Sequence, residues 1–353
     1  MNKFFYTILA VVFTFSATTL ATAGNPDRQG EAGASQLLLN PWSKSAGLHS
    51  LNTANIRGVE AMRVNIAGLS RISKTEFLLS HTRYLEGTDI SINAFGFAQR
   101  IGTSGAFGVT LMATDLGDIP VTTDDQPEGT GATFSPSLIN LGFGYSHTFE
   151  NKVSVGILFR AVSESTADLS AFGLAIDAGV QYVSGEQDNF KFGIALRNVG
   201  TPMTFRGQGL AEGRPNPNEA QFPYTLTYFQ RSQRFELPSM LNIGLSYDFI
   251  VEARHRITVL SNFTSNSFSQ DQIGGGIEYA FNEIFMVRGA YKYEFGSNED
   301  GGVRAPVEQG LSAGVSIEVP LKKDSENTFG LDYAYRVTEP WGGTHNLGVR
   351  INL

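Results

Sequence analysis

Histidine is the side chain best suited to acid–base chemistry or metal binding at neutral pH. The chain has five histidines, which are His49, His81, His147, His255 and His345. No two of them have the spacing of a metal-binding pair on a helix or on a strand. The chain has no cysteine, which excludes a thiolate metal site, a cysteine nucleophile and a disulfide framework. We therefore expect the histidines to be ordinary strand or rim residues, and we expect neither a metal nor a cofactor.

Three further stretches could suggest chemistry, and each has a simpler interpretation. The acidic clusters Asp124-Asp125-x-x-Glu128 and Asn298-Glu299-Asp300 could bind calcium, but charge runs in outer loops are usually solvated. Gly274-Gly275-Gly276 is not followed by a helix, so it indicates a kink or the close approach of another segment rather than a phosphate loop. A lipase or protease would assemble its Ser–His pair from distant segments, which no spacing reveals. We predict that the protein is not an enzyme.

The composition narrows the class of protein that must position these residues. The chain carries 26 basic and 34 acidic residues, a formal charge of −8, which argues against a nucleic-acid binder. It is rich in Gly (39), Phe (26) and Tyr (12), and it has no stretch of apolar residues long enough for a transmembrane helix beyond its N-terminus. These features are typical of a transmembrane β-barrel. A secreted β-sandwich or β-helix is the alternative.

Both ends of the chain carry export-type patterns. Lys3, the apolar run 4–15 and Ala21-Thr22-Ala23 predict a signal peptide over residues 1–23, cleaved after Ala23. An N-terminal membrane anchor is the alternative, but its apolar core would be short. Residues 346–353 alternate strictly between polar and apolar, which predicts a strand, and their pattern resembles the C-terminal signal read by the outer-membrane assembly machinery.

Fourteen alternating segments follow residue 74, and they predict an all-β protein, a 14-stranded antiparallel transmembrane barrel over residues 74–353. The segments are 75–84, 89–100, 105–114, 136–148, 152–164, 171–183, 189–199, 238–250, 254–265, 271–281, 284–295, 308–319, 327–338 and 344–353. Every second connection is short, and the long ones, 115–135, 200–237 and 296–307, all belong to the other set. Short turns at one rim and long loops at the other are typical of outer-membrane barrels.

The two faces of these segments differ in chemistry. One face is apolar, as in Val153, Val155, Ile157 and Phe159, while the other carries Gly, Ser, Asn and nearly every charge. A charge that faces lipid at mid-depth costs about 2–4 kcal/mol, so the charges must face the lumen. These predicted lumen charges are Arg160, Asp177, Lys191, Arg197, Asp248, Arg256, Glu278, Arg288, Lys292, Glu294, Glu318, Asp332, Arg336 and Arg350.

Residues 24–73 differ from the rest and predict a short, partly helical N-terminal plug. Ile56, Val59 and Met62 recur at helical spacing, which predicts a helix over 55–64. The stretches 33–39 and 45–47, and the plug motif Asn65, Ile66, Ala67, Gly68 and Leu69, resemble the N-terminal signature of PorV/PorQ proteins, which are relatives of the FadL-type barrels. Ile66 replaces the proline that is usual in the family.

The resemblance implies an outer-membrane protein with a plug, exported in a Gram-negative-type bacterium and surrounded by membrane lipid and lipopolysaccharide. It further implies a binding and shuttle role in type IX-like protein secretion and surface attachment, with other outer-membrane or exported proteins as partners and with no covalent chemistry. The alternative is a FadL-type passive channel for long-chain fatty acids or other hydrophobic small molecules. The charge-rich lumen argues mildly against that alternative.

The longest loop, 200–237, is stiffened by prolines and unusually aromatic for a solvated segment. Its aromatic residues are Phe205, Phe222, Tyr224, Tyr228 and Phe229. Rigid aromatic side chains are common anchors in protein interfaces, which predicts a partner-binding surface. The alternative is a loop that folds over its own barrel mouth.

Overall fold

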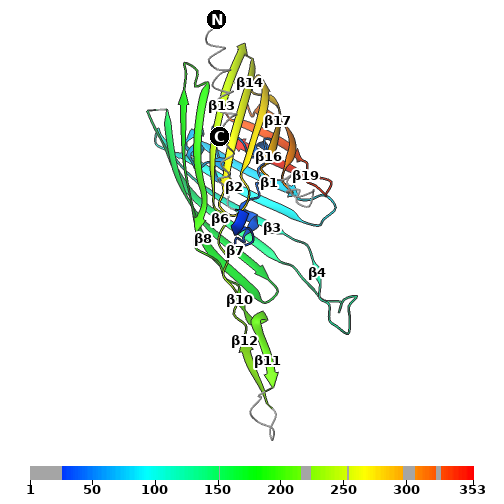
Figure 1. The fold of residues 1–353 in the computed structure, drawn as a ribbon. Coiled ribbons are helices and arrows are strands. Elements are labelled where there is room, and N and C mark those ends of the chain that lie inside the picture. Colours follow the sequence, from blue (N-terminus) through cyan, green and yellow to red (C-terminus); the bar gives the residue numbers. More distant parts are fainter. Residues whose placement is uncertain (1–25, 151, 216–223, 253, 297–306, 323–326) are drawn as a thin grey trace.

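The computed structural model describes residues 26–353 except 151, 216–223, 253, 297–306 and 323–326. Its main sheet has 15 strands, of which β10 (Arg206–Gly207) is a short strand that pairs only with β8, and the other fourteen form a closed antiparallel barrel. The prediction of a 14-stranded antiparallel barrel is therefore confirmed (Figure 1). The predicted signal peptide lies outside the described residues.

All fourteen predicted strands are present, with ends that differ from the prediction by two residues at most. They are β1 (Thr75–Arg83), β2 (Ser91–Ile101), β3 (Gly105–Asp115), β6 (Ser137–Phe149), β7 (Val153–Thr166), β8 (Leu169–Ser184), β9 (Phe190–Gly200), β13 (Met240–Glu252), β14 (His255–Asn266), β15 (Gln272–Phe281), β16 (Phe285–Glu294), β17 (Gly310–Pro320), β18 (Thr328–Arg336) and β19 (Thr344–Asn352). The barrel closes where β1 pairs with β19, from Glu76 opposite Asn352 to Arg83 opposite His345. Every second connection is short and all the long ones belong to the other set, as the sequence predicts, although that set also contains the two-residue turn between β7 and β8.

The alternation of side chains decides which face is buried. In β7 the odd-numbered residues Val155, Ile157 and Phe159 are exposed on the outside, while Ser154, Leu158 and Arg160 are buried inside. An aromatic row crosses four neighbouring strands on the outer face, because Phe77, Phe97, Phe107 and Phe143 lie with successive ring centroids 5.1, 6.0 and 6.5 Å apart. The outside of the barrel is therefore an apolar surface.

The N-terminal segment lies inside the barrel and supplies more than half of the residues of the main buried apolar cluster. Its short elements are η1 (Pro26–Arg28), η2 (Ser35–Leu37), α2 (Ser43–Ala46), α3 (Ala61–Val64) and η3 (Ile66–Arg71). The predicted helix over 55–64 is wrong in length, since only its last four residues are helical. Gly58 adopts φ +73°, which a continuous helix does not allow, although Ile56, Val59 and Met62 are all buried as their spacing predicts. No helix in the described part of the chain is long and apolar enough to cross a membrane.

Inward-facing glycines let the plug approach the barrel wall closely. A Cβ on Gly156 would lie 2.9 Å from the carbonyl carbon and oxygen of Ile66 in the plug. A Cβ on Gly274 would lie 2.6 Å from a methyl group of Leu51, which is the kind of close approach that the run of glycines at 274–276 suggests. The plug is therefore fitted to the wall at backbone level, and side chains at these positions would displace it.

Two sides of the barrel interior contact the plug differently. The apolar side consists of the inner faces of β1, β2, β3 and β7, where Leu78, Ile92, Met112 and Leu158 join one buried cluster with plug residues such as Trp42. The ionic side consists of the inner faces of β9 and β13–β19, which carry most of the buried charges. The plug thus has a hydrophobic contact on one side and a charged one on the other.

The long loops also contain strands that the sequence pattern did not indicate. Loop 116–136 forms the small pair β4 (Ile119–Pro120) and β5 (Thr133–Phe134), and loop 201–239 contains η4 (Gln208–Leu210) and the hairpin β11 (Ala211–Pro215) with β12 (Thr225–Phe229). Both loops project away from the barrel, and the β11–β12 hairpin reaches farthest (Figure 1).

Candidate functional site

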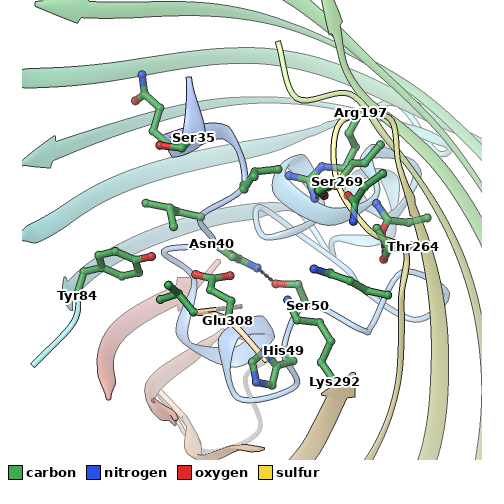
Figure 2. Close-up of a pocket in the computed structure, with 18 of the residues that line it drawn as sticks. Ser35, Asn40, His49, Ser50, Tyr84, Arg197, Thr264, Ser269, Lys292 and Glu308 are labelled. Carbon is green, nitrogen blue, oxygen red and sulfur yellow. Dashed lines mark hydrogen bonds between the residues drawn. The ribbon is translucent and has the colours of Figure 1, made fainter. Parts of the chain in front are cut away.

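A cavity of about 340 Å³ lies between the plug and the barrel wall, and plug and wall residues both line it (Figure 2). Its lining includes Tyr84, Leu116 and Leu138, which places it at the end of the barrel that carries the long loops. Small-molecule sites are commonly concave, of a few hundred Å³, and lined by apolar surface with a few placed polar groups. The cavity, hereafter the plug pocket, falls at the lower end of that size range. It is the candidate functional site.

The plug forms the floor of the pocket through residues 35–40 and 49–51. Arg63, which is buried, donates from Nε to the carbonyl of Leu39 at 2.6 Å and from Nη2 to the carbonyl of Gln36. Asn40 donates to the hydroxyl of Ser50 at 2.8 Å, which joins the two floor segments (Figure 2). Arg63 therefore fixes the main chain whose side chains Leu38 and Leu39 face the cavity.

The walls of the pocket have opposite character. The wall made by the outer ends of β1, β2, β3 and β6 has Tyr84, Ile90, Thr114, Leu116 and Leu138, of which only Thr114 is purely polar. The wall made by β9 and β13–β16 has Arg197, Met240, Asn242, Thr264, Asn266, Ser269, Gln272 and Lys292, of which only Met240 is apolar. Figure 2 shows Tyr84 on one side of the cavity and Arg197, Thr264 and Ser269 on the other.

The charged groups of the pocket are mostly cationic. Arg197 donates to the carbonyl of Leu37 at 3.3 Å, and Lys292 of β16 lies beside Ser50 and His49 in Figure 2. The one acidic lining residue, Glu308, is 3.4 Å from Arg336. Burial, together with the cations Lys292 and Arg336, lowers the pKa of His49 well below its usual value, so its imidazole is neutral at pH 7. The pocket thus offers donors and positive charge.

All of the predicted lumen charges lie on the inner face of the barrel, although only Arg197 and Lys292 line the pocket. The others form pairs below it. Arg160 contacts Asp177 at 2.7 Å, Arg256 and Arg288 share Glu278 at 3.3 and 3.0 Å, and Lys191 binds Asp248. The remaining acids accept from polar neighbours, Glu294 from Gln272 at 2.8 Å and Glu318 from Thr328 at 2.6 Å.

Arg350 is the centre of the contact between the ionic side and the plug. Its guanidinium lies 3.2 Å from Glu60 of the plug, 2.7 Å from Asp332 and 3.8 Å from Glu76. Glu60 in turn accepts from the backbone N–H of Ser45 at 2.9 Å, and Glu76 accepts from the N–H of Val59 at 3.1 Å. The plug carboxylate Glu60 was not among the predicted site residues, because the sequence does not show which wall charge it meets.

The plug motif lies under the pocket rather than in it. Asn65 accepts from the N–H of Ala67 at 3.2 Å and donates to the carbonyls of Thr53 and Val180 at 3.0 and 3.1 Å. Asn65 therefore caps the N-terminus of η3, and Ile66, the first residue of η3, is buried. Asn65, Ile66, Ala67, Gly68 and Leu69 are all buried, which assigns them a packing role in the structure.

The predicted partner-binding residues are divided between two places. Phe205 packs on Phe235 with ring centroids 5.7 Å apart, and the loop base there bonds to the plug through Gly33 N–H and the carbonyl of Glu236 at 3.0 Å. Tyr224, Tyr228 and Phe229 belong to the projecting hairpin and are 47%, 47% and 64% exposed. Phe222 lies outside the described residues. The loop therefore folds over the barrel mouth at its base and projects beyond it.

Most residues of the pocket were not predicted. Asn242, Thr264 and Gln272 are uncharged polar residues at inward positions near the outer ends of their strands. The strand alternation shows that they face the lumen, but many lumen residues are polar, so the sequence does not mark these three as pocket residues. The acidic cluster Asn298-Glu299-Asp300 lies outside the described residues. Within the described part of the chain, no group of three or more His, Asp or Glu side chains is placed to hold a metal ion.

Comparison with solved structures shows the fold. The CymD monoaromatic hydrocarbon channel aligns with a TM-score of 0.56 at 13% identity, over 89% of this chain and 97% of that chain. The toluene transporter TodX of Pseudomonas putida gives 0.51 at 14% identity, over 85% and 93%. A FadL homologue of Pseudomonas aeruginosa gives 0.51 at 11% identity, over 88% and 96%. A scan of protein-family models and a search of the curated proteins give no match.

These likenesses establish a FadL-type barrel architecture and, at such identities, nothing finer. They give no support to the narrower PorV/PorQ assignment, which rests on the N-terminal residues alone. The matched structures are channels and transporters by their own descriptions.

Proposed function

We propose that the protein is an outer-membrane channel that binds and passively passes small molecules with a hydrophobic part. The observation that carries the proposal is the plug pocket, a cavity of about 340 Å³ at the long-loop end of a barrel whose lumen holds the plug. A solute cannot cross such a lumen as it would cross an open pore. It must first bind, and the pocket is a site of suitable size.

The outer-membrane location is supported by the barrel's exterior. Large apolar side chains such as Phe143, Phe159, Leu174, Leu245 and Ile277 are about half exposed, which would be unfavourable in water and favourable against lipid. We propose that membrane lipid and lipopolysaccharide surround this surface and that residues 1–23 are the cleaved signal peptide. The long loops would then face the outside of the cell.

The channel proposal is tested by filling the pocket. Replacing Leu138, which faces the pocket, with Trp should weaken binding of the uncharged fluorescent hydrophobe N-phenyl-1-naphthylamine by about tenfold, because the side chain occupies ligand volume. The matched control is Leu141→Trp, which changes the outer face of the same strand, where Leu141 is 47% exposed. Binding would be measured with the protein in lipid nanodiscs. Unchanged binding in the Leu138 variant, or no binding in the wild type, would refute the proposal.

One observation favours a second function, the binding of another protein. The β11–β12 hairpin stands clear of the barrel and presents Tyr224, Tyr228 and Phe229 to solvent, and such aromatic residues are typical anchors in interfaces. A role in type IX-like secretion would be one form of this function, and it depends on the resemblance of residues 33–69. Neither role requires covalent chemistry or a cofactor.

The second function is tested by removing the hairpin while leaving the loop base that binds the plug. Replacing residues 208–230 by a Gly-Ser link should abolish proteins that co-purify from native outer membrane in mild detergent, and it should leave binding of N-phenyl-1-naphthylamine intact. If no protein co-purifies with the wild type, the second function fails and the channel proposal is unaffected.

A further inference from the structure

We infer that the outer edge of β12 binds an extended segment of another protein by strand addition, so that the hairpin becomes a three-stranded sheet. This inference deepens the second proposed function, protein binding by the β11–β12 hairpin, and it rests on that function. It assigns the contact to the backbone of β12 (Thr225–Phe229) and not to its exposed rings alone.

The pairing of the hairpin shows which backbone groups of β12 face away from β11. The N–H of Gln230 donates to the carbonyl of Leu210 at 2.8 Å, and these two residues are opposite each other when the register of the hairpin is continued by one residue. In an antiparallel pair, such bonded positions alternate with positions whose N–H and C=O turn outward. The outward positions of β12 are therefore Thr225, Thr227 and Phe229.

No described strand covers this edge. The sheet of the hairpin contains only β11 and β12, and the backbone groups of the three outward residues bond to no described residue. All three residues are exposed, and the hairpin stands clear of the barrel in Figure 1. Each outward residue thus offers one donor and one acceptor, which is the pattern that an added strand pairs with.

The other edge of the same hairpin is protected. On β11, Pro215 has no N–H, and the charged side chains of Glu212 and Arg214 pair at 2.9 Å beside it. Proline and charged side chains are devices by which proteins keep exposed edges from pairing. β12 contains neither, since its sequence is Thr-Leu-Thr-Tyr-Phe. The hairpin therefore blocks pairing on one edge and permits it on the other.

The side chains of β12 specify the chemistry of the partner. Side chains alternate between the two faces of a strand, so an added strand would lie beside Thr225, Thr227 and Phe229 on one face and beside Leu226 and Tyr228 on the other. Cross-strand pairs of aromatic and β-branched residues are favourable, and Thr pairs well with Thr. The partner is therefore an uncharged, proline-free segment that is rich in β-branched and aromatic residues.

A second copy of this chain does not fit the edge. Copies in one outer membrane point their hairpins in the same direction, so two β12 strands would meet in parallel, related by a two-fold axis along the strands. That axis sets each outward N–H at the level of the same N–H in the other copy, so that donors face donors. A strand of another protein can instead pair antiparallel.

The test uses a fluorescein-labelled peptide that copies residues 224–230, with two lysines added at its amino end for solubility. The peptide has the composition inferred above, and because it is free in solution it can pair antiparallel with β12. Its binding to the mature protein in lipid nanodiscs is followed by fluorescence anisotropy. We expect saturable binding with a dissociation constant below about 1 mM. A peptide in which both threonines are replaced by proline should not bind.

Variants of the protein locate the effect on the outer edge. Thr227→Pro removes an outward N–H and leaves the bonds between β12 and β11, so it should weaken peptide binding about tenfold or more. The matched control is Thr227→Val, which keeps the N–H and should bind like the wild type. Thr225→Pro, at the first residue of the strand, where proline is tolerated, should also weaken binding. Unchanged heat-modifiable migration on gels shows that the barrel is folded in all three.

Absence of saturable binding by the wild type, or equal binding by Thr227→Pro and Thr227→Val, would overturn the inference. The second proposed function is measured separately, by the proteins that co-purify only when the hairpin is present, so it can stand when strand addition fails. If no protein co-purifies with the wild type, both fail. If the solubilised wild type is a dimer that Thr227→Pro converts to a monomer, the edge binds a second copy and the assigned partner is wrong.

Discussion

The apolar and ionic sides of the barrel hold the same plug by different interactions. On the apolar side, Leu78, Ile92 and Leu158 are almost fully buried against plug residues such as Met62 and Leu69. On the ionic side, Arg350 joins Glu60 of the plug to two wall carboxylates. Apolar contacts are non-directional and tolerate small shifts, whereas a buried ion pair requires its geometry. The apolar side therefore seals the plug, and the ionic side sets its position.

The same division continues upward into the plug pocket. Strands β1, β2 and β3 of the apolar side, with their neighbour β6, end in its apolar wall, and β9 with β13–β16 supplies its polar wall. The two-faced pocket is thus an extension of the two-faced lumen. A closed barrel can keep such a division because each strand has fixed neighbours, so residues of one kind on adjacent strands form a continuous surface.

The largest effect should come from breaking the centre of the ionic side. Arg350→Leu leaves Glu60, Glu76 and Asp332 buried without their shared cation, and we expect a loss of about 3–5 kcal/mol in the free energy of unfolding. Guanidinium titration in detergent micelles, followed by the fluorescence of buried Trp42 in a Trp341→Phe background, measures this loss. The exposed rim residue Arg83, changed to Leu, is the control. A loss below about 1 kcal/mol for Arg350→Leu would contradict the positioning role of the ionic side.

A somewhat smaller loss should follow from a cavity on the apolar side. Leu158 is 0% exposed, and Leu158→Ala should lower the free energy of unfolding by about 3 kcal/mol, since it removes buried contacts with the plug. The same titration measures it. Leu141→Ala, on the outer face of the neighbouring strand, serves as the matched control. Equal losses in the two variants would mean that the apolar cluster does not hold the plug.

Asn65 bonds the plug to itself and to the wall, and its loss should have an intermediate effect. Asn65→Ala removes a cap to Ala67 and donors to Thr53 and Val180, and we expect a loss of about 1–2 kcal/mol. Asn65→Ser keeps a capping oxygen but not the amide donors, so its loss should be smaller. If Ser and Ala behave alike in the titration, the cap contributes nothing and only the bonds from the amide group matter.

The smallest effect should come from replacing a whole ion pair of the ionic side. Lys191 and Asp248 are buried against each other, so changing either one alone to an apolar residue leaves an uncompensated charge. The double variant Lys191→Met/Asp248→Leu removes both charges, and we expect it to unfold within about 1 kcal/mol of the wild type. A double-mutant cycle of unfolding free energies gives the coupling free energy between Lys191 and Asp248. A double variant as unstable as the single ones would show that the pair is needed for more than mutual neutralisation.

The sequence alone determined the barrel. Strand alternation is a local property with a period of two, so the residues of each segment show both that it is a strand and which face is buried. Arg160 and Phe159 are adjacent in the chain, and their chemistry already assigns one to the lumen and the other to the outside. The alternation of short and long connections is also local, which is why the strand count and the order of the loops could be predicted.

The tertiary structure decided the conformation of the plug, the partners in the ion pairs and the lining of the plug pocket. The spacing of Ile56, Val59 and Met62 predicted a ten-residue helix, but Gly58 ends that regularity because the chain must fit the barrel wall. Which plug carboxylate contacts Arg350 depends on how residues 58–64 lie against β19. Glu60 and Arg350 are 290 residues apart in the chain, so no local pattern predicts their contact. The polar wall of the pocket exists only once β9 and β13–β16 are placed side by side. These features depend on non-local packing, which a pattern of period two does not encode.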